Sequence, residues 1–390
     1  MRELKIEKIE TIPFRLPLRR EFRWAGLQES VGGFVCIRIT TNTGIIGYGE
    51  ATPLPDWGGD YNRHSGETLN TVQDIIQNVI APLLIGQDPT NIARAHQIME
   101  NYVRGNSYAK CAIDIALYDI WGKAVNQPVY KLLGGKVRES VTVGHMIGIM
   151  SQEETREEAR GCYEDGIRAF QIKTGEDFER DVAVVKMLRQ EYGNNVWLRL
   201  DANKGYRNVK GALTLLGRMV DESGAPLLDM VEQPVEGLSD MAFVTDKLPF
   251  RTVTDESTWD LADAFEAIKL RATDAISIYL AKAGGIYQAA KIAALCHTFH
   301  YDCDTNGSLE SAIGTAANLH FSLSQPAVCI PSIISINAPA GKHIYKYGGH
   351  YYEDDISVEA LPVKDGALLP LEGPGLGLEI DEGKLEKYRI

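Results

Sequence analysis

Two hydrophobic periods alternate along the chain, and each change of period marks a change of structure. Near the N-terminus apolar and polar residues alternate, which is the period of a strand, at residues 4–13, 33–39 and 45–50. From residue 68 to about 126 the apolar residues recur every three or four positions, which predicts helices. The helix expected over 109–124 is rich in small residues, which suits close packing. Residues 1–130 are therefore predicted to form an α+β domain.

From residue 141 onward, short apolar runs of strand length alternate with helical segments. Eight candidate strands follow from this pattern: 141–145, the four runs ending at 173, 201, 232 and 255, then 275–280, about 301–306 and about 333–337. Helices are expected between them at 153–165, 177–192 and 208–222. Strand–helix units in series favour parallel strands, so residues 131–360 are predicted to form an α/β barrel. The tail, 361–390, is predicted to return to the first domain.

Four consecutive strands of this barrel end in a residue that can do chemistry. Their last residues are Lys173, Asp201, Glu232 and Asp255, which lie 23 to 31 residues apart. That spacing fits one strand, one helix and two loops. The carboxyl ends of parallel strands in a barrel meet at one mouth, so we expect one amine and three carboxylates to converge there. The pattern indicates a metal site with a base beside it.

The overall composition narrows the choice of partners. A formal net charge of −13 argues against nucleic acid and anionic membranes. No apolar run approaches the roughly 20 residues of a membrane-spanning helix, and the N-terminus lacks the apolar core of a signal peptide. Six cysteines without a C-x-x-C pair indicate reduced thiols, which predicts a cytoplasmic protein. A small molecule is the expected partner.

Oxygen ligands alone, without Cys or His, suit Mg²⁺, with Mn²⁺ as a second choice. Three carboxylates leave about three of six octahedral positions for water and a chelating substrate. Removal of a proton α to a substrate carboxylate would develop negative charge that the metal neutralises. Lys173 is the expected base, acting as the neutral amine, for which its pKa must fall from about 10.4.

A simpler interpretation exists for each residue alone. A strand-end Asp is most often the cap of the following helix, and a lone lysine is most often a solvated charge. The four residues occur together, in consecutive units at barrel spacing. Caps and surface charges do not explain that coincidence.

The strand-end motifs resemble the enolase superfamily, in its muconate-lactonizing and mandelate-racemase branches, over nearly the whole chain. The segments that carry the resemblance are 172–175, 200–203, 231–234, 254–257, 283–286, 309–314 and 374–377. It implies an α+β capping domain over a modified (β/α)8 TIM-type barrel. It also implies Mg²⁺ on Asp201, Glu232 and Asp255, with Lys173 as the base that yields an enediolate, a pattern known for this superfamily.

Further site residues follow from the same resemblance. Two residues, Glu256 and Lys282, are expected to lie behind the metal ligands. A homo-oligomer is also expected. Substrate contacts are expected from Gln171, Asn203, Trp24, Trp57, Asp304, Asn306 and Glu310.

The chain departs from the family pattern at three places that bear on the reaction. Gln171 stands where the second strand usually has the first lysine of Lys-x-Lys, and an amide cannot take a proton. Tyr279 stands where the sixth strand of the muconate-type branch carries a second lysine, and Lys282 is out of place in that pattern. Near Asn306, where the racemase branch has a histidine, there is none.

One strong base therefore remains, Lys173, which favours a reaction on a single face of the substrate. We expect a metal-dependent isomerase or lyase, either a cycloisomerase or a dehydratase. One alternative is a racemase or epimerase of an amino acid, proline or betaine derivative, with Tyr279 as the second acid; its ring could instead merely fill the barrel. A catalytically silent metal-binding homologue is a further alternative.

Two substrate classes stay open. Arg19, Arg20 and Arg23 are consistent with an anion-binding loop, and equally with a loop whose charges are simply solvated. Alternatively, Trp24 and Trp57 predict a cage for a cationic amine or betaine, completed by the carboxylates of Asp56 and Asp60. The carboxylates of Asp302 and Asp304, expected at the mouth of the seventh strand, would favour a polyol or an amine.

Overall fold

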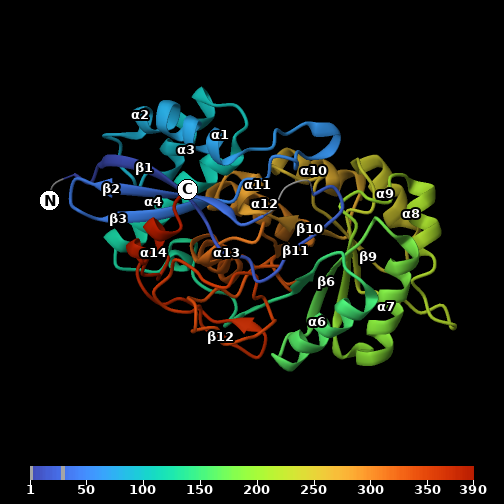
Figure 1. Cartoon of the computed structure of the whole chain (residues 1–390). Helices are drawn as coiled ribbons and strands as arrows, with labels where there is room; N and C mark the ends of the chain where they lie inside the picture. The colour runs from blue at the N-terminus through green and yellow to red at the C-terminus, as the bar shows by residue number, and fades with distance from the viewer. Residues whose placement is uncertain (1–2, 28–30) are drawn as a thin grey trace.

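A computed structural model describes residues 3–27 and 31–390, and Figure 1 shows a small sheet with helices on one side and a barrel on the other. The small sheet is antiparallel and has the order β1-β2-β3. Its strands are β1 (Ile6–Arg15), β2 (Gly33–Thr41) and β3 (Ile46–Ala51). They confirm the three strands predicted near the N-terminus.

Helices cover this sheet, and the longest of them packs directly on β3. The first-domain helices are α1 (Leu69–Ile75), the π-helical turn Ile76–Ile80, α2 (Ala81–Leu84), α3 (Ile92–Tyr102), α4 (Ser107–Ala124) and α5 (Val129–Leu132), preceded by a 3₁₀ turn at Asp60–Asn62. Gly47 and Gly49 of β3 lie against the α4 backbone, where any Cβ would collide with the carbonyls of Ala116 and Ala112. Glycine is required there because helix and strand approach so closely.

Seven parallel strands form the barrel sheet, in the order β5 to β11. They are β5 (His145–Ile147), β6 (Ala169–Lys173), β7 (Trp197–Asp201), β8 (Met230–Glu232), β9 (Arg251–Thr254), β10 (Ala275–Ile278) and β11 (Asp302–Thr305). The intervening helices are α6 (Gln152–Glu164), α7 (Phe178–Tyr192), a 3₁₀ turn at Gly193–Asn195, α8 (Val209–Leu216), α9 (Leu238–Lys247), α10 (Leu261–Leu270), α11 (Leu280–Ala283), α12 (Ile286–Thr298) and α13 (Ala312–Ser324). The predicted modified (β/α) barrel is confirmed.

The predicted eighth strand is wrong, although its segment does close the ring. Ser332 bridges Val143 at one edge of the sheet, and Ile333 bridges Asn306 at the other. Pro331 has no N–H to extend the ladder, and the N–H of Ile336 donates outside the sheet, to the carbonyl of Gly349. Two single bridges therefore stand where a strand was expected.

The prediction of one barrel strand over 141–145 is also wrong, because this segment contributes to two separate strands. β4 (Val141–Thr142) leaves the barrel and pairs with β13 (Ala367–Leu368), which pairs in turn with β12 (Val363–Lys364). Only β5 enters the barrel sheet. The tail then continues to α14 (Glu382–Lys387), drawn in red beside the blue strands in Figure 1. There the N–H of Arg15 donates to the carbonyl of Tyr388 at 3.0 Å.

A buried ion-pair cluster ties the loop after β1 to the barrel. Arg19 and Arg20 both pair with Glu158 of α6, and Glu158 also accepts from Nε2 of His145 in β5. Burial opposes ionisation of Glu158, but His145 and Arg19 outweigh it and lower its pKa. Arg23 pairs with Glu176 instead, on the exposed surface. Arg19 and Arg20 thus serve the domain contact, and none of the three arginines is among the residues that line the cavity described below.

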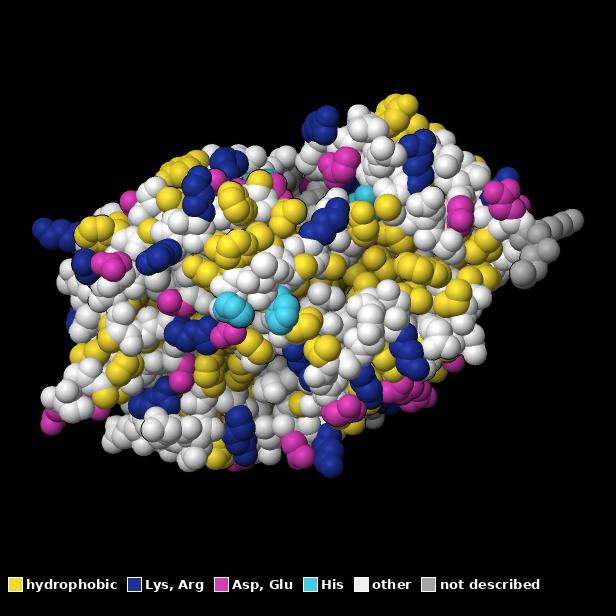
Figure 2. All heavy atoms as spheres, turned by 180° about the vertical axis from the view of Figure 1, so that it is seen from behind, with side chains coloured by type: hydrophobic (Ala, Val, Ile, Leu, Met, Phe, Trp, Pro, Cys, Tyr) yellow, Lys and Arg dark blue, Asp and Glu magenta, His cyan; other side chains and the backbone are white. Residues whose placement is uncertain are grey.

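Charged side chains of both signs are scattered over the rear face of the molecule, as Figure 2 shows. Within residues 3–27 and 31–390, no helix has both the length and the apolar character that a membrane crossing needs. All six cysteines are free thiols, five of them buried and Cys329 exposed.

Candidate active site

The barrel register brings the four predicted strand-end residues to one mouth. Lys173 of β6 lies opposite Asp201 of β7, and Asp201 lies opposite Glu232 of β8. Asp255 follows directly after β9. All four residues are buried, none more than 7% exposed. The structure thus assembles the amine and the three carboxylates that the sequence pattern predicted would converge.

Lys173 is held by two oxygens. Its Nζ lies 2.6 Å from Oδ2 of Asp201 and donates to Oδ1 of Asn203 at 3.2 Å. Burial lowers the pKa of Lys173, but the carboxylates of Asp201 and Glu232 outweigh burial, so the net shift is upward. A cation on those carboxylates would remove that attraction, and burial would then favour the neutral amine that a base requires.

Gln171 points toward the same carboxylates because it lies two residues before Lys173 on the same face of β6. Its Nε2 donates to Oε2 of Glu232 at 2.6 Å and to Oδ2 of Asp201 at 3.1 Å. Asn306 donates to the other oxygen of Glu232 at 3.2 Å. Both amides therefore fix the orientation of the candidate metal ligands.

Arg199 was missed by the sequence analysis. It is fully buried in the barrel interior, with Nε 2.6 Å from Oε2 of Glu232, and it also pairs with Asp304. The signal was present in the sequence, because Arg199 lies two residues before Asp201 and so faces the same way. Burial raises the pKa of Asp304, and Arg199 opposes that rise. A charged residue at this position indicates a buried ionic layer beneath the mouth.

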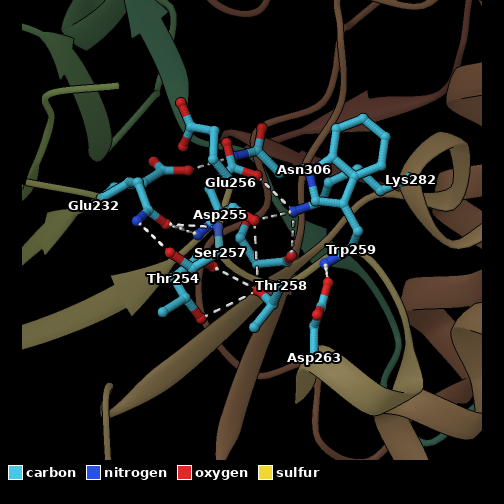
Figure 3. A network of polar contacts seen from close by, with 12 residues as sticks. Glu232, Thr254, Asp255, Glu256, Ser257, Thr258, Trp259, Asp263, Lys282 and Asn306 are labelled. Carbon is cyan, nitrogen blue, oxygen red and sulfur yellow. Dashed lines mark hydrogen bonds and ion pairs between the residues drawn. The ribbon is translucent and has the colours of Figure 1, made fainter. Parts of the chain in front are cut away.

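Asp255 is positioned by the loops that surround it, as Figure 3 shows. The side chain of Gln233 accepts from the backbone N–H of Asp255 at 2.8 Å. Lys282 of α11 donates to Oδ1 of Asp255 at 2.5 Å and to its carbonyl at 2.8 Å. The other carboxylate oxygen, Oδ2, is buried and has no hydrogen-bond partner within the described ranges. That oxygen is available to a ligand.

Glu256 lies behind the mouth beside Asn203. The Nδ2 of Asn203 donates to Oε1 of Glu256 at 3.2 Å, while its Oδ1 faces Lys173. Burial raises the pKa of Glu256 well above its usual range, and the carboxylate of Asp255 adds to the rise. Asn203 thus links the candidate base to a buried acid.

The buried charges at the mouth and beneath it do not balance. Five carboxylates face three cations, an excess of two negative charges when all are ionised. The groups are Asp201, Glu232, Asp255, Glu256 and Asp304 on one side, and Lys173, Arg199 and Lys282 on the other. A buried excess of this kind is costly unless a cation compensates it. Together with the unpaired Oδ2 of Asp255, the oxygen-only donor set fits a divalent cation.

A cavity opens above these carboxylates. The capping domain and the barrel both contribute walls. Its lining residues are Trp24, Leu54, Trp57, Met146, Gln171, Lys173, Asn203, Asp255, Tyr279, Asn306, Gly307, Ser308, Leu309 and Ile333. Five of the seven predicted substrate contacts line it: Trp24, Trp57, Gln171, Asn203 and Asn306.

Two predicted substrate contacts do not line the cavity. Asp304 lies beneath the mouth and is engaged by Arg199. Glu310 is buried behind the loop, where its Oε1 accepts from the N–H of Ser308, and burial raises its pKa to about 7. The prediction that Asp302 lies at the mouth is also wrong, because Asp302 is the first residue of β11 and lies at the opposite end of that strand.

The acidic half of the predicted amine cage is likewise absent from the lining. Asp60 is 2% exposed and lies against Ser257, outside the cavity. Asp56 lines an adjoining groove, which shares Leu54 and Ser308 with the cavity. The two tryptophans remain in the lining, without Asp56 and Asp60.

Tyr279 faces Lys173 across the barrel, since β6 and β10 are four positions apart in a ring that the 332–333 segment completes. Its ring packs on Trp57, with centroids 4.9 Å apart. No side chain in the described ranges hydrogen-bonds its hydroxyl, and burial raises its pKa well above 10. A phenol in this state can donate a hydrogen bond but is a poor base.

Two family models match the chain. The model described as Enolase C-terminal domain-like matches residues 154–384. The model described as Mandelate racemase / muconate lactonizing enzyme, N-terminal domain, matches residues 13–134.

Similar proteins extend over nearly the full length. The N-succinyl-L-Arg/Lys racemase of Bacillus cereus is 32% identical, covering 99% of this chain and 98% of the relative. Muconate cycloisomerase 1 of Rhodococcus opacus is 30% identical, covering 98% and 97%. The solved structure of the Bacillus cereus racemase has a TM-score of 0.88 at 31% identity, covering 99% and 98% of the two chains. That of a muconate lactonizing enzyme from Pseudomonas fluorescens, complexed with muconolactone, has a TM-score of 0.88 at 28% identity, covering 100% of both.

Proposed function

The chain belongs to the mandelate racemase and muconate lactonizing enzyme family of the enolase superfamily, and is a metal-dependent isomerase or lyase. From this premise we propose that Lys173 removes the α-proton of a small carboxylate substrate, and that the resulting enediolate then eliminates or cyclises. The proposed cofactor is Mg²⁺, with Mn²⁺ as a substitute, held by Asp201, Glu232 and Asp255. When bound, it supplies positive charge next to the developing enediolate.

The observation that carries the proposal is that Lys173 is the one amine among the described residues lining the cavity. Its Nζ is oriented by Asn203 and Asp201, so its lone pair can be aimed at a bound substrate once the amine is neutral. The proton it takes stays on that side of the substrate. Lys173 can return that proton to carbon or to a leaving group, which suits a dehydratase or a cycloisomerase.

The residues around the base have supporting roles. Gln171 and Asn306 orient Glu232, Lys282 orients Asp255, and the tryptophans of the capping domain exclude water from above. Exclusion of water strengthens the electrostatic contacts inside the cavity.

Racemisation or epimerisation is the second candidate. One observation favours it: Tyr279 lies across the barrel from Lys173, with its hydroxyl free of partners in the described ranges. It would have to deliver a proton from the opposite face, and its raised pKa makes the reverse removal slow. The named relatives are enzymes, so the catalytically silent alternative has no support.

Proton NMR in D₂O tests the proposal. With Mg²⁺, the wild-type enzyme is expected to exchange the α-proton of its substrate, and Lys173→Met is expected to lose at least about 10²–10⁴-fold in exchange rate. Lys186→Met, on the exposed side of α7, is the matched control and should keep the wild-type rate. Unchanged exchange in Lys173→Met would remove Lys173 as the base. If the wild-type enzyme incorporates deuterium at the α-carbon with inversion of configuration, and Tyr279→Phe loses this inversion, the result would favour an epimerase.

Self-association is also proposed. Large apolar side chains are exposed on the neighbouring helices α9 and α10, namely Phe243, Leu261 and Phe265. Exposed apolar groups of this kind often mark an interface between copies. Sedimentation velocity at two protein concentrations tests this, and a monomer at both would refute it.

A further inference from the structure

A loop of the capping domain, residues 57–64, rests on the three barrel loops that follow the candidate metal ligands. Each barrel loop supplies one contact, from a residue that comes two to four positions after Asp201, Glu232 or Asp255. The contacts join Nζ of Lys204 to the carbonyl of Gly59 at 3.1 Å, the carboxylate of Glu236 to the N–H of Tyr61 at 2.7 Å, and the hydroxyl of Ser257 to the carboxyl of Asp60. The same three loops thus carry the candidate ligands and hold the 57–64 loop.

Aromatic packing adds to these contacts and involves the loop of Asp255 most. Trp259 lies four residues after Asp255 (Figure 3). Its ring packs on Trp57, with centroids 5.2 Å apart, and stacks on His64 at 4.7 Å. Lys282 adds a further connection, since it donates to Oδ1 of Asp255 and its Nζ lies 5.6 Å from the ring centroid of Trp57. Trp57 is also a wall of the cavity, so the position of the 57–64 loop decides whether that wall is in place.

Gln233 connects the ligand loops to one another. It is fully buried and follows Glu232 directly. Its Oε1 accepts from the N–H groups of Asp255 and Ser257, at 2.8 and 3.1 Å. Its Nε2 donates to Oγ of Ser257 at 2.7 Å and to the carbonyl of Val235 at 2.8 Å. The two backbone N–H groups fix which end of the amide is the oxygen, and all four hydrogen-bonding positions of the amide are used.

Ser257 extends this connection to the capping domain. Its Oγ accepts from Gln233, which leaves its own O–H as the donor to the carboxyl of Asp60. An unbroken chain of hydrogen bonds therefore runs from Asp60 through Ser257 and Gln233 to the backbone N–H of Asp255. It joins the 57–64 loop to a candidate metal ligand.

The docked position of the loop also carries costs. Asp60 is 2% exposed, and burial raises the pKa of its carboxyl, although Ser257 opposes that rise. Its Oδ1 has no hydrogen-bond partner in the part of the chain that the structure describes. Tyr61 and Asn62 both have left-handed backbone, with φ of 52° and 55°. A half-satisfied buried carboxyl and two strained residues disfavour docking, so a change in the support beneath the loop shifts its equilibrium.

We propose that docking of the 57–64 loop and occupancy of the metal site are coupled, with Asp60, Ser257 and Gln233 as positioning residues. This inference rests on the proposed function, which places Mg²⁺ on the three carboxylates. A cation there fixes the three ligand loops and so stabilises the docked loop. By linkage, the docked loop raises the affinity for the cation by the same factor. Metal binding thereby also holds the Trp57 wall of the cavity in place.

Mg²⁺ binding without substrate, measured by calorimetry, tests one direction of the coupling. Asp60→Ala removes the acceptor of Ser257 and should weaken Mg²⁺ binding about fivefold or more, since coupling between sites is typically about 5–150-fold. Asp60→Asn loses the charge but keeps an acceptor oxygen, and should bind Mg²⁺ nearly as tightly as the wild type. Asp74→Ala removes an exposed carboxylate from α1 of the same domain and is the matched control. Wild-type affinity in Asp60→Ala overturns the coupling, and equal weakening in both Asp60 variants overturns the hydrogen-bond chain in favour of charge alone.

Hydrogen exchange of the loop amides tests the other direction. The N–H of Tyr61 donates to Glu236, and the N–H of His64 donates to the carbonyl of Gly58 at 2.8 Å, so both amides are protected when the loop is docked. Saturating Mg²⁺ should slow their exchange about fivefold or more in the wild type, relative to EDTA. Ser257→Ala, also saturated with Mg²⁺, should lose most of this protection. Equal slowing in Ser257→Ala and the wild type overturns the proposal.

The coupling and the proposed function fail in different ways. If the wild-type protein takes up no Mg²⁺, the proposed metal site is wrong and the coupling falls with it. If the wild type binds Mg²⁺ and exchanges the α-proton, while Asp60→Ala binds Mg²⁺ equally well, the proposed function stands and only the coupling is wrong.

Discussion

Replacement of Arg199 by methionine is the sharpest test of the ionic layer beneath the mouth. The guanidinium is completely buried and contacts two carboxylates, with Nε 2.6 Å from Glu232 and a second pair to Asp304. Methionine is unbranched and flexible like the arginine stem, but it is shorter and carries no charge. The variant therefore leaves both carboxylates in the barrel interior without their cation.

The magnitude follows from that burial. Removal of one partner of a buried ion pair costs about 3–5 kcal/mol, because the remaining charge is uncompensated. We expect Arg199→Met to lose about this much free energy of unfolding in EDTA. The loss should be smaller with Mg²⁺, because a cation on Glu232 restores part of the missing positive charge. The free energy of unfolding of Arg199→Lys should lie between those of the wild type and Arg199→Met, since an ammonium keeps the charge but not the planar guanidinium that can bind two carboxylates.

Urea unfolding followed by circular dichroism, in EDTA and in Mg²⁺, measures both effects. Arg218→Met is the matched control, because Arg218 pairs with Glu179 on the exposed surface and its loss should leave the midpoint unchanged. Adding Asp304→Asn to Arg199→Met should recover part of the lost stability, by about 0.5–3 kcal/mol. If Arg199→Met is as stable as Arg218→Met in EDTA, Arg199 does not compensate the buried charges of Glu232 and Asp304.

Three further expectations concern the metal and the buried acids. Glu232→Gln should weaken Mg²⁺ binding, measured by calorimetry. Loss of a residue that only supports a metal ligand costs roughly 10–100-fold in affinity, and the loss here should be larger. Unchanged affinity would show that Glu232 is not a metal ligand. EDTA should abolish α-proton exchange and lower the thermal midpoint, because Mg²⁺ at 100 times its Kd contributes about 2.7 kcal/mol, and activity that persists without metal would contradict the metal role. Burial raises the pKa of Glu50 from 4.5 to about 8, so the folded state keeps a proton that the unfolded state loses above pH 4.5, and stability should fall as pH rises from there to about 8. Each such carboxyl changes the free energy of unfolding by at most about 1.4 kcal/mol per pH unit. Urea unfolding at pH 5, 6.5 and 8 should therefore show a smaller loss of stability with rising pH for Glu50→Gln than for the wild type. An identical slope in the two proteins would refute the raised pKa of Glu50.

Local sequence pattern was sufficient for most of the fold. Period-two alternation located the three strands of the capping domain, and the 109–124 pattern located α4 to within two residues. The pattern failed at both edges of the barrel sheet. Residues 141–145 have the composition of one strand, but they serve two sheets. The segment at 333–337 has strand composition, but Pro331 and a backbone hydrogen bond from Ile336 to Gly349, outside the sheet, limit it to single bridges.

For the candidate site, the sequence determined which residues end the strands, because a barrel makes strand ends converge whatever the loops do. Lys173, Asp201, Glu232 and Asp255 were found in this way. Their roles as base and metal ligands remain proposals. The sequence did not reveal whether Tyr279 would face Lys173 or fill the barrel, because that depends on the side chains around it.

Tertiary structure alone decided how the charges are distributed. Arg19 and Asp60 look like substrate contacts in the sequence, yet one closes a domain contact with Glu158 and the other lies against Ser257. Arg199 looks like an ordinary strand residue, yet it neutralises two buried carboxylates. Side-chain charge is a property of the sequence, whereas its pairing depends on groups that are distant along the chain and become neighbours only on folding. The chemistry of the strand ends is therefore encoded locally, while the pairing of the buried charges around them is a consequence of the fold.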